Sequence, residues 1–297
     1  MTLIVSLIIT TYNWPEALKL TLNSALQQSQ LPDEIIIADD GSTESTHHCI
    51  QKIADESPVP IFHSWQENKG FRAAMSRNRA IAKAKGDYVI VIDGDLILHP
   101  NFIEDHLKIA EKKVFIQGGR VLLQQELSLA LIRGESIKLS LFTKGIKNRK
   151  NVLYSPLLSK LFSYSTTSLK AIKGCNFSLF KEDIFSVNGF DNKFVGWGRE
   201  DSEFVARLMN AGVTRKNLKF AGIAYHLYHP ENPRSSLPEN DQRLQQSINE
   251  KRIRCDDGID KFLKSDKYYE TTHWKNLDFM QEFQLNSKKQ SNNLGKY

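Results

Sequence analysis

Cysteine is scarce in this chain of 297 residues. Cys49, Cys175 and Cys255 are odd in number and far apart, so they form neither a disulfide framework nor the close spacing of a metal cluster. A reducing compartment is therefore expected. Lysine and arginine number 40 against 34 acidic residues, a formal net charge of +6. This basic balance fits an anionic ligand or an anionic membrane surface and selects neither.

Long hydrophobic runs are also absent. Leu3 to Ile9 is apolar but too short to cross a bilayer, and no basic segment or small-residue cleavage site flanks it as in a signal peptide. A buried first strand explains this segment better. We expect a cytoplasmic protein without a transmembrane segment, with any membrane contact being peripheral, at the cytoplasmic face.

Strand patterns and helical spacings alternate along the first hundred residues. Strands are expected over 3–10, 34–38, 59–62 and 88–92, and helices over 16–28, 45–55 and 71–85. This alternation is typical of βαβ units, and it predicts an α/β fold with a mostly parallel sheet flanked by helices. Right-handed crossovers would place the ends of these strands, at Asn13, Asp40 and Asp93, on one edge of the sheet.

Two aspartates one residue apart, Asp93 and Asp95, follow the apolar stretch from Tyr88 to Ile92. At the carboxyl end of a buried strand they would lie where open α/β sheets bind ligands. Carboxylate oxygens suit a divalent cation such as Mn²⁺ or Mg²⁺, and a cation there could neutralise a diphosphate. The alternative is a strand that ends in an ordinary polar turn.

Further polar residues near the same edge are candidates for a nucleotide site. Asp39 or Asp40 could accept hydrogen bonds from a base or from ribose hydroxyls. Arg77 could pair with a phosphate or hold Asp93 in place, the alternative being an exposed helix charge. Asn68 lies in a turn, where a nucleotide contact is the second interpretation.

Taken in order, these motifs resemble those of the family 2 glycosyltransferases of GT-A fold. The matching segments are Thr10 to Pro15, Asp39 to Ser42, Glu67 to Gly70, Arg77 to Ala80 and Gly86 to Asp95. The resemblance implies a UDP-sugar donor and a Rossmann-like sheet. It also implies roles for individual residues: uracil and ribose would contact Thr11, Tyr12, Asn13 and Asp39 or Asp40, while Asp93 would contact ribose or metal and Asp95 the metal.

A second distinctive segment runs from Gly196 to Asp201. Glycines on both sides of Trp197 allow a tight turn that exposes the indole, a good platform for a sugar ring. Glu200 and Asp201 would open a helix over 202–211, where the macrodipole favours carboxylates. The alternative is that they only cap this helix.

This segment resembles the acceptor motif of β-1,4-galactosyltransferases, W-G-W-G-x-E-D. The resemblance implies that Trp197 and Gly198 contact the acceptor and that Asp201, beside Glu200, is the catalytic base. Val195 replaces the first aromatic of the motif. Similar motifs occur in bacterial chondroitin-type and lipooligosaccharide transferases, so the donor sugar stays open.

A His-x-x-His pair follows the expected last core strand, 220–225. His226 or His229 could supply an imidazole as the third protein ligand of the metal. The resemblance to GT-A enzymes implies one metal-binding histidine in this region, and the sequence does not choose between the two.

We therefore expect one catalytic domain with a C-terminal extension. Residues 1–118 would form the nucleotide-sugar half and 119–238 the acceptor half, which carries a basic insertion over 127–169. The charges of that insertion form either a solvated basic face, or a lid or contact surface for an acidic lipid or acceptor. The extension, 239–297, would contain an exposed helix over 242–251 and a disordered end.

The expected activity is an inverting, metal-dependent transfer of a hexose from a UDP-sugar to a hydroxyl of a glycan acceptor. The hexose would be of the galactose, N-acetylgalactosamine or glucose type, in bacterial surface polysaccharide or lipopolysaccharide synthesis. No nucleic-acid partner is expected, and the oligomeric state is open. A nucleotidyltransferase of sugar phosphates is the first alternative, although Thr11 to Pro15 lacks the glycine-rich loop usual for a triphosphate. A non-catalytic carbohydrate-binding module is the second, but it would not need the aspartate and histidine pairs.

Overall fold

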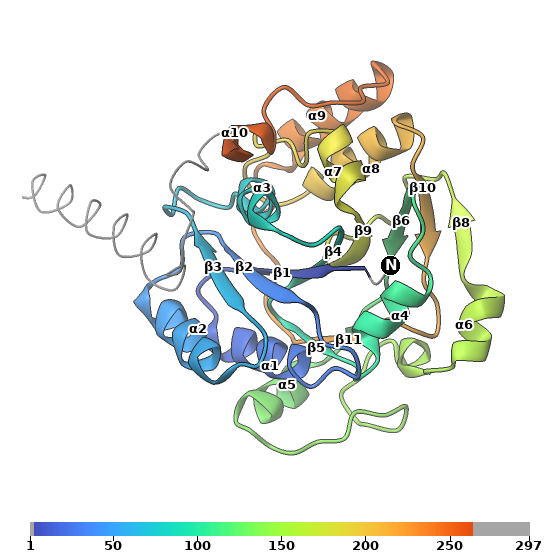
Figure 1. Ribbon diagram of the computed structural model, residues 1–297. Helices are drawn as coiled ribbons and strands as arrows, with labels where there is room; N and C mark the ends of the chain where they lie inside the picture. Colours follow the sequence, from blue (N-terminus) through green and yellow to red (C-terminus); the bar gives the residue numbers. More distant parts are fainter. Residues whose placement is uncertain (1–2, 264–297) are drawn as a thin grey trace, which may run out of the picture.

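An eight-stranded sheet runs through the molecule, a computed structural model that describes residues 3–263 (Figure 1). Across the sheet the strands are β3 (Ile61–Trp65), β2 (Glu34–Asp39), β1 (Val5–Thr11), β4 (Tyr88–Asp93), β9 (Asn176–Phe180), β6 (Val114–Gln117), β10 (Thr214–Asn217) and β8 (Tyr164–Thr166). The pairs β3–β2, β2–β1, β1–β4 and β6–β10 are parallel. β9 runs antiparallel to both β4 and β6, and β8 antiparallel to β10. The expectation of a mostly parallel α/β sheet is confirmed.

Helices cover both faces of the parallel part, which is why its strands are apolar along their whole length. Successive residues of β1 point to opposite faces. Leu7 and Ile9 pack with Leu18 of α1 (Pro15–Ala25), in a cluster that also includes α2 (Glu44–Glu56). Ile8 packs with Ile81 of α3 (Ala73–Lys83) on the other face. Figure 1 shows α1 and α2 below the sheet and α3 above it.

A second, three-stranded sheet brings distant segments together below the carboxyl end of β4. Its order is β5 (Leu96–Leu98), β11 (Ala224–His226) and β7 (Val121–Leu122). β11 pairs antiparallel with β5, so that His226 lies opposite Leu96. The Leu227 amide donates a hydrogen bond to the carbonyl of Asp95. This small sheet therefore fixes the His-x-x-His segment beside the second aspartate of the motif.

Several expectations for the second half were wrong in detail. Between the two sheets, residues 118–120 form no strand, because the chain leaves the large sheet after β6 and enters the small one at Val121 of β7. The strand expected over 220–225 is shorter and lies later: β11 covers only Ala224–His226, and positive φ angles of 55° at Phe220 and 56° at Gly222 precede it. Strands β8, β9 and β10 were not expected.

The remaining helices all follow β5 along the chain. The expected insertion, 127–169, contains regular structure. The helices are α4 (Phe102–Lys108), α5 (Gln125–Ile132), the 3-10 helix η1 (Arg149–Val152), α6 (Pro156–Phe162), α7 (Lys181–Ser186), α8 (Glu200–Asn210), α9 (Leu237–Asn249) and α10 (Asp260–Leu263). Within residues 3–263 no helix combines the length and the apolar character that crossing a bilayer requires. The disordered end expected for the extension lies outside the described residues.

Candidate active site

The carboxyl ends of β1, β2 and β4 meet at one edge of the large sheet. The strand register aligns Thr10 with Asp93 and Thr11 with Asp39. The residues expected to contact the nucleotide therefore belong to adjacent loops, as right-handed crossovers require.

Asp39 and Asp40 are buried and already hydrogen-bonded within the loop that follows β2. One carboxylate oxygen of Asp39 accepts the amide of Ser42 at 2.8 Å, and the other lies 2.8 Å from Nε2 of His63. Asp40 accepts the side-chain amide of Gln66 at 2.6 Å and the backbone amide of Arg72 at 2.6 Å. Burial raises the pKa of Asp40. These bonds hold the loop after β2 in one shape.

The turn after β1 is hydrogen-bonded to the loop after β2. The Asn13 amide donates to Oγ of Ser42 at 2.8 Å, and its side-chain oxygen accepts the amide of Thr43 at 2.7 Å. Nδ2 of Asn68 donates to the hydroxyl of Tyr12 at 3.0 Å. Half of Tyr12 is exposed. The arrangement offers an exposed aromatic ring and nearby polar groups, which a planar base could stack against and hydrogen-bond.

Arg77 links the aspartate motif to the first turn of α8. Its guanidinium is buried and lies 3.1 Å from Oδ1 of Asp93 and 3.2 Å from Oε1 of Glu200. Its Nε donates to Oγ1 of Thr10 at 3.2 Å. Of the two roles considered for Arg77, these contacts are those of a residue that holds Asp93. Burial, with the neighbouring charge of Asp201, raises the pKa of Glu200 to about 7.

Asp201 is brought to the same place by close packing. The amide of Ser202 donates to Oδ1 of Asp201 at 2.6 Å. A β-carbon on Gly174 would lie 3.0 Å from the Asp201 β-carbon, so any larger residue would crowd this contact. The next residue, Cys175, accepts the amide of Asp93 through its carbonyl at 3.2 Å. Residues more than a hundred positions apart thus form one site.

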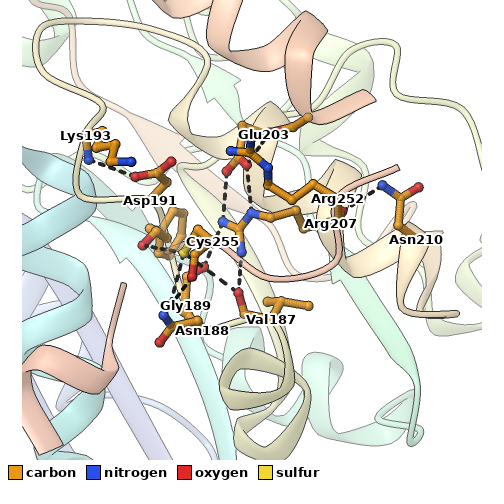
Figure 2. A network of polar contacts seen from close by, with 12 residues as sticks. Val187, Asn188, Gly189, Asp191, Lys193, Glu203, Arg207, Asn210, Arg252 and Cys255 are labelled. Carbon is orange, nitrogen blue, oxygen red and sulfur yellow. Dashed lines mark hydrogen bonds and ion pairs between the residues drawn. The ribbon is translucent and has the colours of Figure 1, made fainter. Parts of the chain in front are cut away.

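α8 is anchored by the buried ion pair of Arg207 and Glu203 (Figure 2). Nε of Arg207 lies 2.7 Å from Oε1 of Glu203, and Nη2 of Arg207 lies 2.8 Å from Oε2 of Glu203. The guanidinium also donates to the carbonyls of Val187 and Gly189. A buried, fully hydrogen-bonded charge pair tolerates little displacement. This network therefore fixes the helix whose first turn carries Glu200 and Asp201.

Asp95, His226 and His229 form a group that could hold a metal ion. Their ligand atoms all lie within 4.8 Å of one another, and each Nε2 is 3.4 Å from Oδ2 of Asp95. Oδ1 of Asp95 is buried and finds no hydrogen-bond partner among the residues described. Burial raises the pKa of Asp95 to about 6, while burial and the charge of Arg120 lower the pKa of His226 to about 4. A neutral imidazole and an unsatisfied carboxylate oxygen are the donors that a divalent cation needs. Asp93 is not part of this group.

The Gly196–Gly198 turn has the geometry that its glycines predicted. The φ angles are 77° at Gly196 and 105° at Gly198. Nδ2 of Asn240 in α9 donates to the carbonyl of Gly198 at 2.9 Å. Trp197 is 37% exposed, and the guanidinium carbon of Arg234 lies 5.3 Å from the centroid of its ring. One face of the indole is therefore covered by a cation.

The comparisons with known proteins agree with this geometry. The model for "Glycosyl transferase family 2" matches residues 6–172, which is more than half of the chain. The chain belongs to glycosyl transferase family 2. The model for the "N-terminal domain of galactosyltransferase" matches residues 160–230, the segment that carries Trp197 and Asp201.

Curated relatives of this family 2 chain include bacterial glycosyltransferases and polysaccharide synthases. A chondroitin synthase of Escherichia coli is 27% identical over 241 residues, covering 76% of the chain and 35% of the relative. The Escherichia coli UDP-Glc:alpha-D-GlcNAc-diphosphoundecaprenol beta-1,3-glucosyltransferase WfaP is 39% identical over 92 residues, covering 31% of the chain and 35% of the relative. The chain thus spans about a third of each. The crystal structure of S. aureus TarS matches with a TM-score of 0.53 at 17% identity, covering 83% of the chain and 41% of TarS, and supports the GT-A fold.

Sequence reasoning missed several side chains of this family 2 site. His63 and Gln66 hold the two aspartates after β2, and Ser202 holds Asp201. Arg120 acts electrostatically on Asp95 and His226. His63, Gln66 and Arg120 lie outside the motifs that they serve, so spacing along the sequence gives no signal for them. Ser202 directly follows Asp201 and could have been suspected from its place.

Proposed function

We propose that this chain is an inverting, metal-dependent hexosyltransferase that uses a UDP-sugar as donor and a glycan hydroxyl as acceptor. The observation that carries the proposal is the double ion pair of Arg77. It joins Asp93, at the end of the donor strands, to Glu200, next to Asp201 in the acceptor motif. A nucleotide loop and a candidate base thereby share one site, as a transfer between two sugars requires.

The donor half would bind the nucleotide. Tyr12 and Asn13 would contact uracil, and the loop held by Asp39 and Asp40 would contact uracil and ribose. A Mn²⁺ or Mg²⁺ ion held by Asp95 with His226 or His229 would supply Lewis-acid neutralisation of the diphosphate. The buried, unsatisfied Oδ1 of Asp95 supports this assignment.

Asp201 would act as the general base. Glu200 is committed to the ion pair with Arg77, whereas Asp201 makes no such pair within residues 3–263 and is held by Ser202 at the start of α8. Asp201 would remove the proton from the acceptor hydroxyl, whose oxygen would attack the anomeric carbon on the face opposite UDP. Inversion follows from a single displacement with one base carboxylate, unlike the two carboxylates of most glycosidases.

The biological setting is proposed from the relatives. Chondroitin synthase and WfaP build glycans, so we propose a role in bacterial surface polysaccharide or lipopolysaccharide synthesis. The donor sugar would be of the galactose, N-acetylgalactosamine or glucose type. The protein would act in the cytoplasm, with peripheral contact at the membrane face.

A donor-hydrolysis screen tests the reaction class. The purified chain is incubated with UDP-galactose, UDP-N-acetylgalactosamine or UDP-glucose, and release of UDP is measured with Mn²⁺, with Mg²⁺ and with a chelator. We expect metal-dependent release from at least one donor. Failure of every donor in the presence of metal would argue against the proposal.

Calorimetry of UDP binding tests the metal site. Asp95→Ala should abolish the metal-dependent part of UDP affinity. Asp87→Ala is the matched control, because Asp87 is exposed at the opposite end of the same strand. Unchanged UDP affinity in Asp95→Ala would count against the metal assignment.

A further inference from the structure

A basic cavity lies at the sheet edge beside this site. It encloses about 180 Å³ between the ends of β6 and β10, the segment after β6, and η1. Its lining includes four cationic side chains, from Arg120, Lys150, Lys173 and Lys219, and no acidic residue. So many like charges around one small cavity repel one another unless an anion lies between them.

These cations form no ion pair in the part of the chain that the structure describes, although the charge of Arg120 acts on Asp95. Residues 3–263 place no carboxylate within ion-pair distance of Arg120, Lys150 or Lys173. The ammonium group of Lys219 lies 5.9 Å from the centroid of the Tyr164 ring instead. Burial lowers the pKa of Lys173, and the charges of Arg120 and Lys219 lower it further.

An unused hydrogen-bond donor lies in the same cavity. Nδ2 of Asn217, at the end of β10, is buried and has no acceptor among residues 3–263. A buried donor without a partner costs free energy, and an anionic oxygen is the acceptor that would remove that cost.

The place of the cavity in the sheet relates it to the acceptor. The nucleotide loops follow β1 and β2, whereas the cavity lies beyond β4 and β9, at the ends of β6 and β10. Lys173 directly precedes Gly174, the residue that packs against Asp201. In the strand order the cavity is therefore separated from the nucleotide loops by β4 and β9, and this is the side on which we place the acceptor glycan.

We propose that this cavity binds an oxyanion of the acceptor glycan, a carboxylate or a phosphate, and thereby selects acidic acceptors. The identification of this ligand as the acceptor rests on the proposed glycosyl transfer. Guanidinium and ammonium groups form charge-assisted hydrogen bonds with both kinds of oxyanion, so the two sources share one chemistry.

Direct binding tests the proposal without requiring turnover. The full chain is titrated with two pairs of probes by calorimetry: methyl β-D-glucuronide against its methyl ester, and methyl β-D-glucoside 6-phosphate against methyl β-D-glucoside. We expect at least one charged probe to bind about tenfold more tightly than its neutral partner, as a hydrogen bond to a charged group implies. The pair that shows the difference identifies the source of the oxyanion. Equal binding within both pairs would overturn the proposal.

The double variant Lys150→Gln/Lys219→Gln locates the effect. Both lysines are exposed at the cavity, so their replacement should preserve the fold. We expect this variant to lose the preference of about tenfold for the charged probe and to keep its affinity for UDP. Lys19→Gln/Lys52→Gln is the matched control, since it removes the same charge from exposed positions on α1 and α2.

Two results of the variant experiment would contradict the proposal. Equal losses in both double variants would indicate a general charge effect, and loss of UDP affinity instead would assign the cavity to the donor. If no donor is hydrolysed but the charged probe still requires Lys150 and Lys219, the glycosyl-transfer proposal fails while the oxyanion site stands.

Discussion

The proposed donor and acceptor halves of the site differ in how their charged groups are paired. After β2, Asp39 and Asp40 are buried and bound by His63, Gln66 and backbone amides. After β6, by contrast, Arg120 lines a cavity with no acidic residue in its lining. The carboxylates after β2 have hydrogen-bond partners, whereas the lining of the cavity after β6 offers its cations no carboxylate.

This difference has a physical consequence for specificity. A satisfied polar network is rigid and presents one shape, which suits a ligand common to many enzymes such as a nucleotide. Unpaired charges gain free energy only when a particular ligand arrives, so they discriminate between ligands. We infer that selectivity for the acceptor lies around β6 and β10, and that the loops after β1 and β2 are shared machinery.

The largest expected effect separates catalysis from donor binding. Asp201→Asn should lower turnover by about 10²–10⁴-fold, the usual contribution of a general base, and leave UDP affinity unchanged. Turnover is measured by UDP release with acceptor, and affinity by calorimetry. Asp241→Asn, at a partly exposed carboxylate that pairs with Arg199, is the control. A parallel loss of UDP affinity would show that Asp201 belongs to both halves.

The second prediction concerns the buried link between the halves. Arg77→Met should lower the free energy of unfolding by about 3–5 kcal/mol, because Asp93 and Glu200 stay largely buried without their countercharge. Denaturant titration measures this change. Adding Glu200→Gln should restore part of the stability, because it removes a buried charge that has lost its partner.

Arg133→Met provides the contrast for that prediction. Arg133 pairs with Glu135 at the surface, where an ion pair contributes about 0–1 kcal/mol. If Arg77→Met destabilised the protein no more than Arg133→Met, the halves would not be coupled through this arginine.

The same contrast explains what the sequence could predict. The donor half follows from sequence because each motif directly follows an apolar strand, so topology alone brings the strand ends at Thr11, Asp39 and Asp93 together. The acceptor half does not. β10 reads Thr-Arg-Lys-Asn, a polar sequence with no strand pattern, and its Arg215 is nevertheless buried. Polar strands of this kind are set by tertiary packing and have no periodic signal.

Long-range contacts were equally inaccessible from spacing. β9 contains a buried serine, Ser178, which interrupts its apolar pattern and hydrogen-bonds Tyr88 at 2.8 Å and His106 at 2.7 Å. The pair of Arg77 and Glu200 joins residues 123 positions apart. Charge and burial indicate that such groups need partners, but only the folded chain identifies them.

A pH titration of stability tests the role of buried His106, which contacts Ser178 of β9. His106 in α4 is fully buried, and burial lowers its pKa to about 4. The unfolded chain, with an ordinary pKa of about 6.5, binds this proton first as the pH falls. The contribution of neutral His106 to the free energy of unfolding is therefore fully present above about pH 6.5 and is lost towards pH 4. For a pKa shift of about 2.5 units this contribution is about 3 kcal/mol.

His106→Asn tests this assignment, because the asparagine amide can replace the Nδ1 contact with Ser178. The variant should show a smaller loss of stability between pH 6.5 and pH 4 in denaturant titrations. His48→Asn, at an exposed position on α2, should keep the slope of the unaltered protein. Identical slopes in both variants would mean that another group causes the pH dependence.

The smallest effect is expected at the exposed indole. Trp197→Ala should raise the KM for the acceptor about tenfold, equivalent to about 1.4 kcal/mol, while UDP affinity stays the same. The reason is that Arg234 covers one face of the ring and leaves the remaining exposed surface for a sugar. Trp197→Phe should keep most of the affinity, since it preserves an aromatic face. If UDP affinity fell and the acceptor KM did not change, Trp197 would belong to the donor half, and the division between rigid donor loops and a selective acceptor surface would have to be redrawn.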